Sequence, residues 1–334
     1  MKKLLLSVFG FALVSSLCSP YAYSQSDDSD SDVDYVCFDN PASLESVNGY
    51  CTLTPEKYEV KIYEMGLCST NPLSGTTFSK DSCVTTLLNS SPIAANMANG
   101  SSIILKCQNQ RDCPKPKPGE YGYAYIVIED DFKLKFSYKL NNITYYSNGK
   151  NSSAANPVKN AKTSPPAVDF IETLNDFGDP EEGFSATATA LVDNGTGSIT
   201  ALLTDSNLKA ATSSASVTRL VGVYLPKSKV KITDETKGLE VQFVVTDQGG
   251  GLESCVSDNG EDGQARQDEE QRIQEDEERE IAESGDDPDV IARIDQARSL
   301  REQERETQDL EQMSQLSQVC IFGSGPFSAK FKPF

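Results

Sequence analysis

The stretch YGYAYIVIEDDFKLKFSYKL, residues 121–140, decides the fold class of this chain. In its second half apolar and polar side chains alternate, so that one face of an extended strand would carry Phe132, Leu134, Phe136, Tyr138 and Leu140. A period of two is typical of a half-buried β-strand, and the first half, apolar on both faces, is typical of a strand covered on two sides. Because the polar pair Asp130-Asp131 joins the two runs, the pattern predicts a β-hairpin at the centre of an antiparallel domain.

Strand patterns continue on both sides of this stretch. Further candidates are residues 58–64, 83–88, 101–107, 184–192, 198–204, 217–225, 230–233, 239–246 and 327–331. They predict a mainly β chain, an antiparallel β-sandwich of which a jelly roll is one form, over residues 35–334. The polar segment around 155–166 leaves open a division into two β domains. Residues 168–178 predict a short helix that ends at Gly178.

Residues 262–317 break the β pattern. They are strongly polar and rich in helix-forming residues, Gly285 suits the end of one helix, and Pro288 suits the first position of the next. Folded back at Gly285, the two arms would share a thin apolar seam in which Ile273 meets Leu300. We therefore expect an acidic α-helical hairpin inserted into the β body.

Residues 1–24 have the features of a bacterial secretory signal peptide. Lys2 and Lys3 precede an apolar run that is too short to span a membrane, and small residues precede Gln25. We expect a secreted, periplasmic or cell-surface protein with no transmembrane segment in the mature chain.

An acidic leader follows the signal, at residues 25–34, and its composition predicts disorder. The spacing of Asp28, Asp30 and Asp32 is similar to the start of a calcium loop, but Val33 occupies the position that needs glycine. We expect no cofactor, with a loosely bound Ca²⁺ as the one exception.

Nine cysteines occur in the chain, and eight of them follow the signal peptide. An even number after such a signal indicates disulfides, and the absence of histidine and of CxxC spacing argues against zinc. Sequence alone does not determine the connectivity. Pairing of neighbours predicts the bonds Cys37–Cys51, Cys68–Cys83, Cys107–Cys113 and Cys255–Cys320.

The charge distribution limits the partners. The net charge is −20, and residues 258–311 hold 21 acidic residues against 7 arginines, so nothing in the chain suits nucleic acid. Surface or extracellular proteins, or another copy of the chain through strand exchange at residues 327–331, are the expected partners.

The sequence points to no catalytic residue and to no cofactor-binding or metal-binding residue. Without histidine, Ser-His-Asp and Cys-His systems are excluded. We expect a non-catalytic structural, adhesive or assembly protein. The alternative is a carbohydrate-binding or carbohydrate-hydrolysing protein that uses a carboxylate pair and the tyrosines of this region, which are Tyr121, Tyr123, Tyr125, Tyr138, Tyr145 and Tyr146.

Overall fold

The computed structural model describes residues 35–98, 102–104, 115–178, 183–193, 195–255 and 272–334, apart from 274, 278 and 284–286. The expected signal peptide, the acidic leader and the Cys107–Cys113 bond lie outside the described residues. Contacts divide the chain into a β unit, which includes residues 35–255 and 312–334, and a helical unit within Val256–Glu311. Each unit is considered by itself below.

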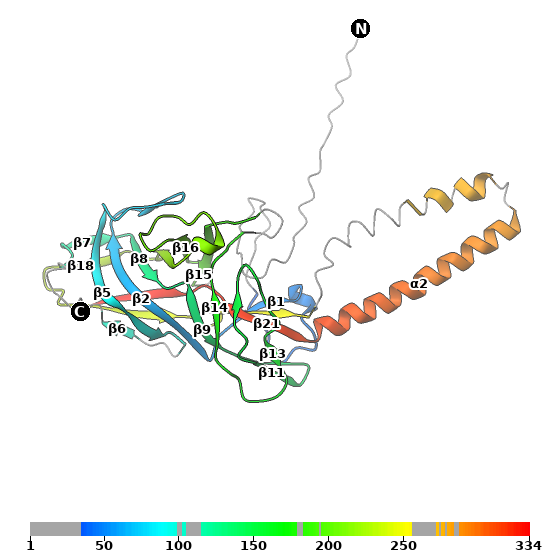
Figure 1. Cartoon of the computed structure of the whole chain (residues 1–334), viewed down its shortest axis with the longest axis horizontal. Coiled ribbons are helices and arrows are strands. Elements are labelled where there is room, and N and C mark those ends of the chain that lie inside the picture. The colour runs from blue at the N-terminus through cyan, green and yellow to red at the C-terminus, as the bar shows by residue number, and fades with distance from the viewer. Residues whose placement is uncertain are drawn as a thin grey trace, which may run out of the picture. The chain divides into compact units, whose positions relative to one another are not determined.

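The β unit is built around one large, mainly antiparallel sheet (Figure 1). Its strands follow the order β12, β14, β9, β2, β8, β17, β16 and β15, and β5 pairs with β2. Their bounds are β2 Lys57–Cys68, β5 Cys83–Asn96, β8 Tyr123–Ile128, β9 Asp131–Lys135, β12 Ser152–Ser153, β14 Phe170–Thr173, β15 Thr187–Val192, β16 Gly197–Thr204 and β17 Arg219–Leu225.

Smaller sheets complete the β unit. One joins β1 (Tyr50–Leu53), β20 (Gly250–Ser254) and β21 (Val319–Ser324), and another joins β22 (Ser328–Pro333), β19 (Leu239–Val244) and β6 (Ser102–Ile104). The rest are β10–β11–β13 (Ser137–Leu140, Ile143–Ser147, Ala161–Lys162), β18–β7 (Val230–Ile232, Gly119–Tyr121) and β3–β4 (Leu73–Ser74, Thr77–Phe78). Short 3₁₀ helices occupy Glu45–Val47 and Ser214–Ser216.

The central stretch is extended as predicted, but the predicted hairpin at Asp130-Asp131 is wrong. Strands β8 and β9 do not pair with each other; both run antiparallel to β2 and follow one another along its length. The backbone N–H of Glu129 donates to Lys61 O at 2.9 Å and continues this ladder across the break. A twelve-residue β2 is long enough to pair with both runs, so the polar pair marks a break in one long strand rather than a turn.

The nearest real hairpin lies one strand later, between β10 and β11. Its turn is Asn141-Asn142, with φ of 49° and 61°. Asparagine tolerates this left-handed conformation, which two-residue hairpin turns of type I′ require. The helix predicted over 168–178 is also wrong, because Phe170–Thr173 forms β14 and pairs with β9.

The predicted alternation correctly identifies the core-facing side chains. Phe132, Leu134, Phe136 and Leu140 are at most 1% exposed. Phe136 stacks on Phe322 of β21 with ring centroids 5.2 Å apart, and Tyr58 of β2 meets Phe327 at 6.1 Å. Aromatic side chains therefore join the large sheet to strands near the C-terminal end.

The helical unit contains helical residues between 272 and 283 and most of α2, which spans Pro288–Leu316. Two helices separated by the segment around Gly285 agree with the predicted helix pair. At about 1.5 Å per residue, α2 is about 43 Å long.

Candidate functional site

Ion pairs join the two arms of the helical unit. The carboxylate of Glu277 accepts a hydrogen bond from Arg298 Nε at 2.8 Å and another from Arg301, and Arg293 pairs with Glu280. The Glu277 side chain is only 12% exposed. Burial raises the pKa of Glu277, but the hydrogen bonds and charges of the two arginines outweigh it and hold that pKa below its ordinary value.

The apolar seam between the arms is narrower than predicted. Ile294 is buried, whereas Leu300 remains 55% exposed and adds little to it. Three of the four arginines of α2 pair with acids on the other arm. Among the remaining charged side chains of α2 that are described as exposed, carboxylates therefore outnumber arginines. Among the described side chains, the exposed ones include Asp289, Asp295, Glu304 and Glu311.

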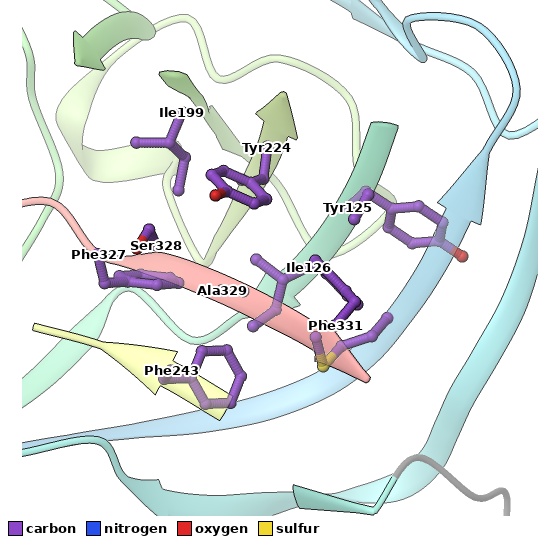
Figure 2. Close-up of a pocket in the computed structure, with 12 residues that line it drawn as sticks. Tyr125, Ile126, Ile199, Tyr224, Phe243, Phe327, Ser328, Ala329 and Phe331 are labelled. Atoms are coloured by element: carbon purple, nitrogen blue, oxygen red, sulfur yellow. The ribbon is translucent and has the colours of Figure 1, made fainter. Parts of the chain in front are cut away.

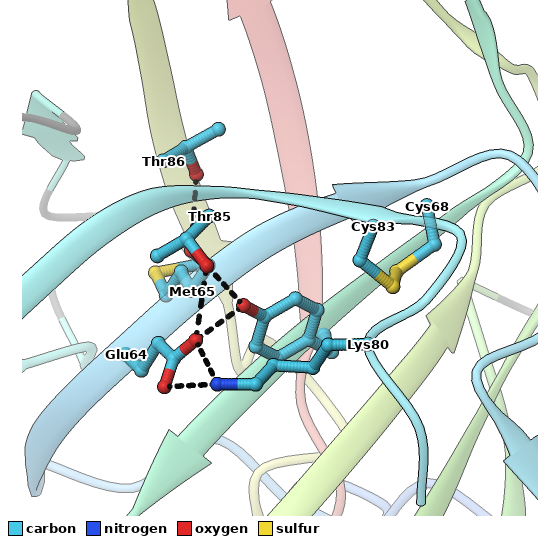
Figure 3. A network of polar contacts seen from close by, with 8 residues as sticks. Glu64, Met65, Cys68, Lys80, Cys83, Thr85 and Thr86 are labelled. Atoms are coloured by element: carbon cyan, nitrogen blue, oxygen red, sulfur yellow. Dashed lines mark hydrogen bonds and ion pairs between the residues drawn. A yellow bond between two sulfur atoms is a disulfide. The ribbon is translucent and has the colours of Figure 1, made fainter. Parts of the chain in front are cut away.

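A buried carboxylate in the β unit was missed by the sequence analysis. Glu64 on β2 is 7% exposed and accepts hydrogen bonds from the Tyr125 hydroxyl at 2.5 Å and from Thr85 at 3.1 Å. Lys80 Nζ lies 2.9 and 3.1 Å from its two oxygens, and Figure 3 shows the whole network. Burial, followed by the charge of Glu64, raises the pKa of Tyr125 well above its ordinary value.

This network ties down a loop. Lys80 lies between Cys68 and Cys83, which form a disulfide with a Cα–Cα distance of 4.0 Å. The ring of Tyr125 lies over Gly66, where an added Cβ would come 2.3 Å from Cε1, so only glycine fits. The polar side-chain atoms of Glu64, Lys80, Thr85 and Tyr125 all have hydrogen-bond partners within the network. The arrangement therefore fits a structural anchor for the loop rather than a reactive group.

The tyrosines of the central region serve mainly packing. Tyr121, Tyr125 and Tyr145 are buried, and the Tyr121 and Tyr145 hydroxyls donate to the backbone carbonyls of Lys117 and Ser317. The Tyr138 hydroxyl donates to Phe38 O at 2.6 Å, and burial raises the pKa of Tyr138 to about 12. The hydroxyls of these four tyrosines thus have partners inside the β unit, and Tyr123 and Tyr146 are half-buried.

Two of the acids at the break between β8 and β9, Glu129 and Asp131, have hydrogen-bond or ion-pair partners. Glu129 accepts from the Tyr63 hydroxyl at 3.3 Å and lies 2.5 Å from Lys61 Nζ, while Asp131 accepts from Thr173 at 2.6 Å. Burial raises the pKa of Asp130, and the neighbouring acids add to this effect.

A small apolar cavity lies between the large sheet and β22 (Figure 2). Its volume is about 20 Å³, which is close to the minimum for one water molecule. The side chains of Tyr224, Phe243 and Phe327 are directed toward it, and its lining contains no carboxylate. Beside it, Asp193 accepts hydrogen bonds from Tyr224 and Ser328, both at 2.6 Å. The cavity is too small for a sugar.

A second buried carboxyl belongs to Glu172 on β14. It is 0% exposed; Oε2 accepts from the Ser324 N–H at 2.5 Å, and Oε1 has no hydrogen-bond partner among the described atoms. Burial raises the pKa of Glu172 to about 7. Nearby, the Asn160 side chain exchanges two hydrogen bonds of 2.8 Å with the Phe322 backbone. These groups attach the 150–172 region to β21.

The described residues form three disulfides, which are Cys37–Cys51, Cys68–Cys83 and Cys255–Cys320. These are three of the four bonds that the pairing of neighbouring cysteines predicts. Disulfides are typical of an oxidising, extracellular environment. Cys255 directly follows β20, and its N–H donates to Gln318 O at 3.0 Å. This hydrogen bond and the Cys255–Cys320 disulfide hold together the two chain ends from which the helical insertion departs.

The described residues contain no group of three or more Cys, Asp or Glu side chains placed to hold a metal ion. The possible calcium ligands Asp28, Asp30 and Asp32 lie outside those residues. Within the described part of the chain, no helix has both the length and the apolar character needed to cross a membrane.

Comparisons with known proteins add no identification: no family model, no curated protein and no solved structure matches this chain.

Proposed function

We propose that this chain is an exported, non-catalytic structural, adhesive or assembly protein, and that the helical hairpin is its interaction element. The carrying observation is the ion-paired architecture of the hairpin. Glu277 and Glu280 engage Arg293, Arg298 and Arg301 between the arms. Since three of the four arginines of α2 are paired with these acids, the charge left on the rest of α2 is mainly negative and suits a basic or cation-bridged partner.

The β unit supports this function as a scaffold. We propose that it is a two-layer antiparallel sandwich, because Tyr58 and Tyr224 of the large sheet, and Phe136 directly after β9, meet aromatic rings near the C-terminal end. The buried carboxyls have structural partners, and the cavity beside Tyr224 is close to the size of one water. No observation favours the alternative of carbohydrate binding or hydrolysis.

Neutralising carboxylates on α2 tests the proposal. The variant D295N/E304Q/E311Q removes three exposed charges from the helix, and D27N/D28N/D30N removes three from the acidic leader as a matched control. The probe is a poly-L-lysine surface, from which each protein is released by increasing salt. We expect the α2 variant to be released at clearly lower salt than the control variant. Equal release of both variants would mean that the hairpin has no special role in binding basic surfaces.

A further inference from the structure

Strand β15 is an end strand of the large sheet and differs from the other long edges. Its sequence, TATALV, contains no charge and no proline. In contrast, β5 contains Pro92 and has two register shifts in its pairing with β2, and β22 carries Lys330 and Lys332. Monomeric proteins usually protect sheet edges by such devices, because an unprotected edge pairs with other strands.

Hydrogen bonding shows which backbone groups of β15 face outward. The N–H of Leu203 on β16 donates to Ala186 O at 2.8 Å, and the register continues as Ala188↔Ala201 and Ala190↔Ile199. In an antiparallel pair, alternate residues turn their N–H and C=O groups toward the partner, so those of Thr189 and Leu191 turn away from β16. At Thr187 the outward groups already contact the Ser185 hydroxyl, at 3.4 and 3.1 Å.

We propose that β15 is a self-association edge, which pairs antiparallel with β15 of a second copy of this chain about a two-fold axis at Ala190. The outward groups belong to residues two positions apart, so Thr189 can exchange two hydrogen bonds with Leu191 of the partner subunit. The symmetry repeats the exchange and gives four N–H···O bonds. The two large sheets become one continuous sheet.

The side chains on this edge suit a second copy. Ala190 would oppose its own counterpart at the axis, where a small residue leaves room. Leu191 and Leu225 are 46% and 43% exposed and lie in one row of the sheet, because both pair with Ser198. Pairing would cover part of this apolar row. Acidic residues are concentrated at 25–34 and 258–311, so β15 itself brings no like charges together.

Cysteine cross-linking tests the register. Facing residues at the axis form a non-hydrogen-bonded pair with Cα atoms about 4.5 Å apart, which lies within disulfide range. We expect Ala190→Cys to form a covalent dimer on mild oxidation. Ala188→Cys is the matched control on the same strand and face. The two copies of residue 188 would lie about 13 Å apart along the strands, and we expect no cross-link.

A proline variant tests the interface without a cross-link. Thr189→Pro removes an outward N–H and leaves the bonds to β16 in place, as prolines on edge strands do. Analytical ultracentrifugation should show a concentration-dependent dimer for the mature chain and only monomer for the variant. A mature chain that is monomeric at every concentration and gives no Ala190→Cys cross-link would overturn the proposal. So would a dimer that Thr189→Pro leaves unchanged.

Discussion

Tyr125 donates its hydroxyl to Glu64 at 2.5 Å, and this bond joins β8 to β2 on the face of the sheet opposite the main core. The carboxylate also accepts hydrogen bonds from Lys80 and Thr85. A single buried acid therefore links a strand pair to the disulfide-closed loop beside it.

Removal of the Tyr125 hydroxyl should destabilise the β unit. Tyr125→Phe deletes a hydrogen bond to a buried charged group, which typically contributes about 1.5–3 kcal/mol. We expect a fall of that size in the free energy of unfolding, measured by urea denaturation with circular dichroism. Tyr123→Phe, on the same strand at a half-buried position, is the control and should change stability by less than about 0.5 kcal/mol. Equal effects of the two variants would contradict an anchoring role for Glu64.

The position of Glu64 shows where sequence analysis reaches its limit. Strict alternation from Tyr58 through Val60 and Ile62 places Glu64 on the main-core face. A register shift between Ile62 and Glu64 turns it to the opposite face instead, next to Tyr125. The signal available in the sequence was a charged residue at a buried position of an apolar strand, but its partner depends on a bulge that no local pattern predicts.

Local patterns were sufficient where structure is local. The face occupied by Phe132, Leu134 and Phe136 follows from the two-residue period of a strand, whatever that strand pairs with. The partner of β8 and β9 is β2, a strand distant in the sequence, and no local pattern identifies such a partner. For this reason the predicted hairpin was wrong. The helix pair was predictable because its composition differs sharply from the β unit, whereas the burial of its seam depended on how its ion pairs formed.

The buried carboxyl of Glu172 should make stability depend on pH. Its pKa is about 7 in the folded chain, against an ordinary value of 4.5, so the folded state retains the proton to higher pH. The free energy of unfolding should therefore fall as the pH rises from 4.5 to about 7, and then level off.

Glu172→Gln removes this titration. At each pH we compare the stability of the variant with that of the unmodified chain in the same buffer, by thermal unfolding. We expect this difference to favour the variant more at pH 8 than at pH 4. Asp169→Asn is the control from the same region. The hydrogen bond with Lys57 lowers the pKa of Asp169. Asp169→Asn should therefore reduce the free energy of unfolding more at neutral pH than in the acid range, which is the opposite pH dependence. Identical pH slopes for the Glu172→Gln and unmodified proteins would refute the assignment.

The Cys255–Cys320 bond should stabilise the β unit strongly. It closes a loop of 65 residues, which corresponds to about 4 kcal/mol in the chain-entropy model, whereas Cys68–Cys83 closes 15 residues and corresponds to about 3 kcal/mol. We expect the double serine variant at 255 and 320 to lose more stability than that at 68 and 83. Peptide mapping without reduction checks the pairing, and a free thiol at Cys255 would be incompatible with it.

Residues 155–166 should resist proteolysis although their composition is that of a linker. Asn160 is 0% exposed, its N–H donates to Cys320 O at 3.0 Å, and its side chain satisfies the Phe322 backbone. Asn160→Ala would leave two buried backbone groups unpaired, at a cost of roughly 2 kcal/mol or more, and should open this segment to trypsin. Asn156→Ala, at an exposed position, should not. Two stable fragments from the unmodified chain, separated by a cut here, would show two β domains instead.

Deletion of the hairpin tests the proposed function most directly. The described contacts require the last turn of α2 to stay, because Leu44 N–H donates to Leu316 O at 2.9 Å, so a short Gly/Ser linker should replace only Val256–Glu311. The measurement is the size and location of the protein after bacterial cells and medium are fractionated, with Thr189→Pro in parallel to identify β15 dimers. We expect the deletion variant to be exported and folded, with its associations beyond that dimer lost. A deletion variant that retains every association of the full chain would contradict the role assigned to the hairpin.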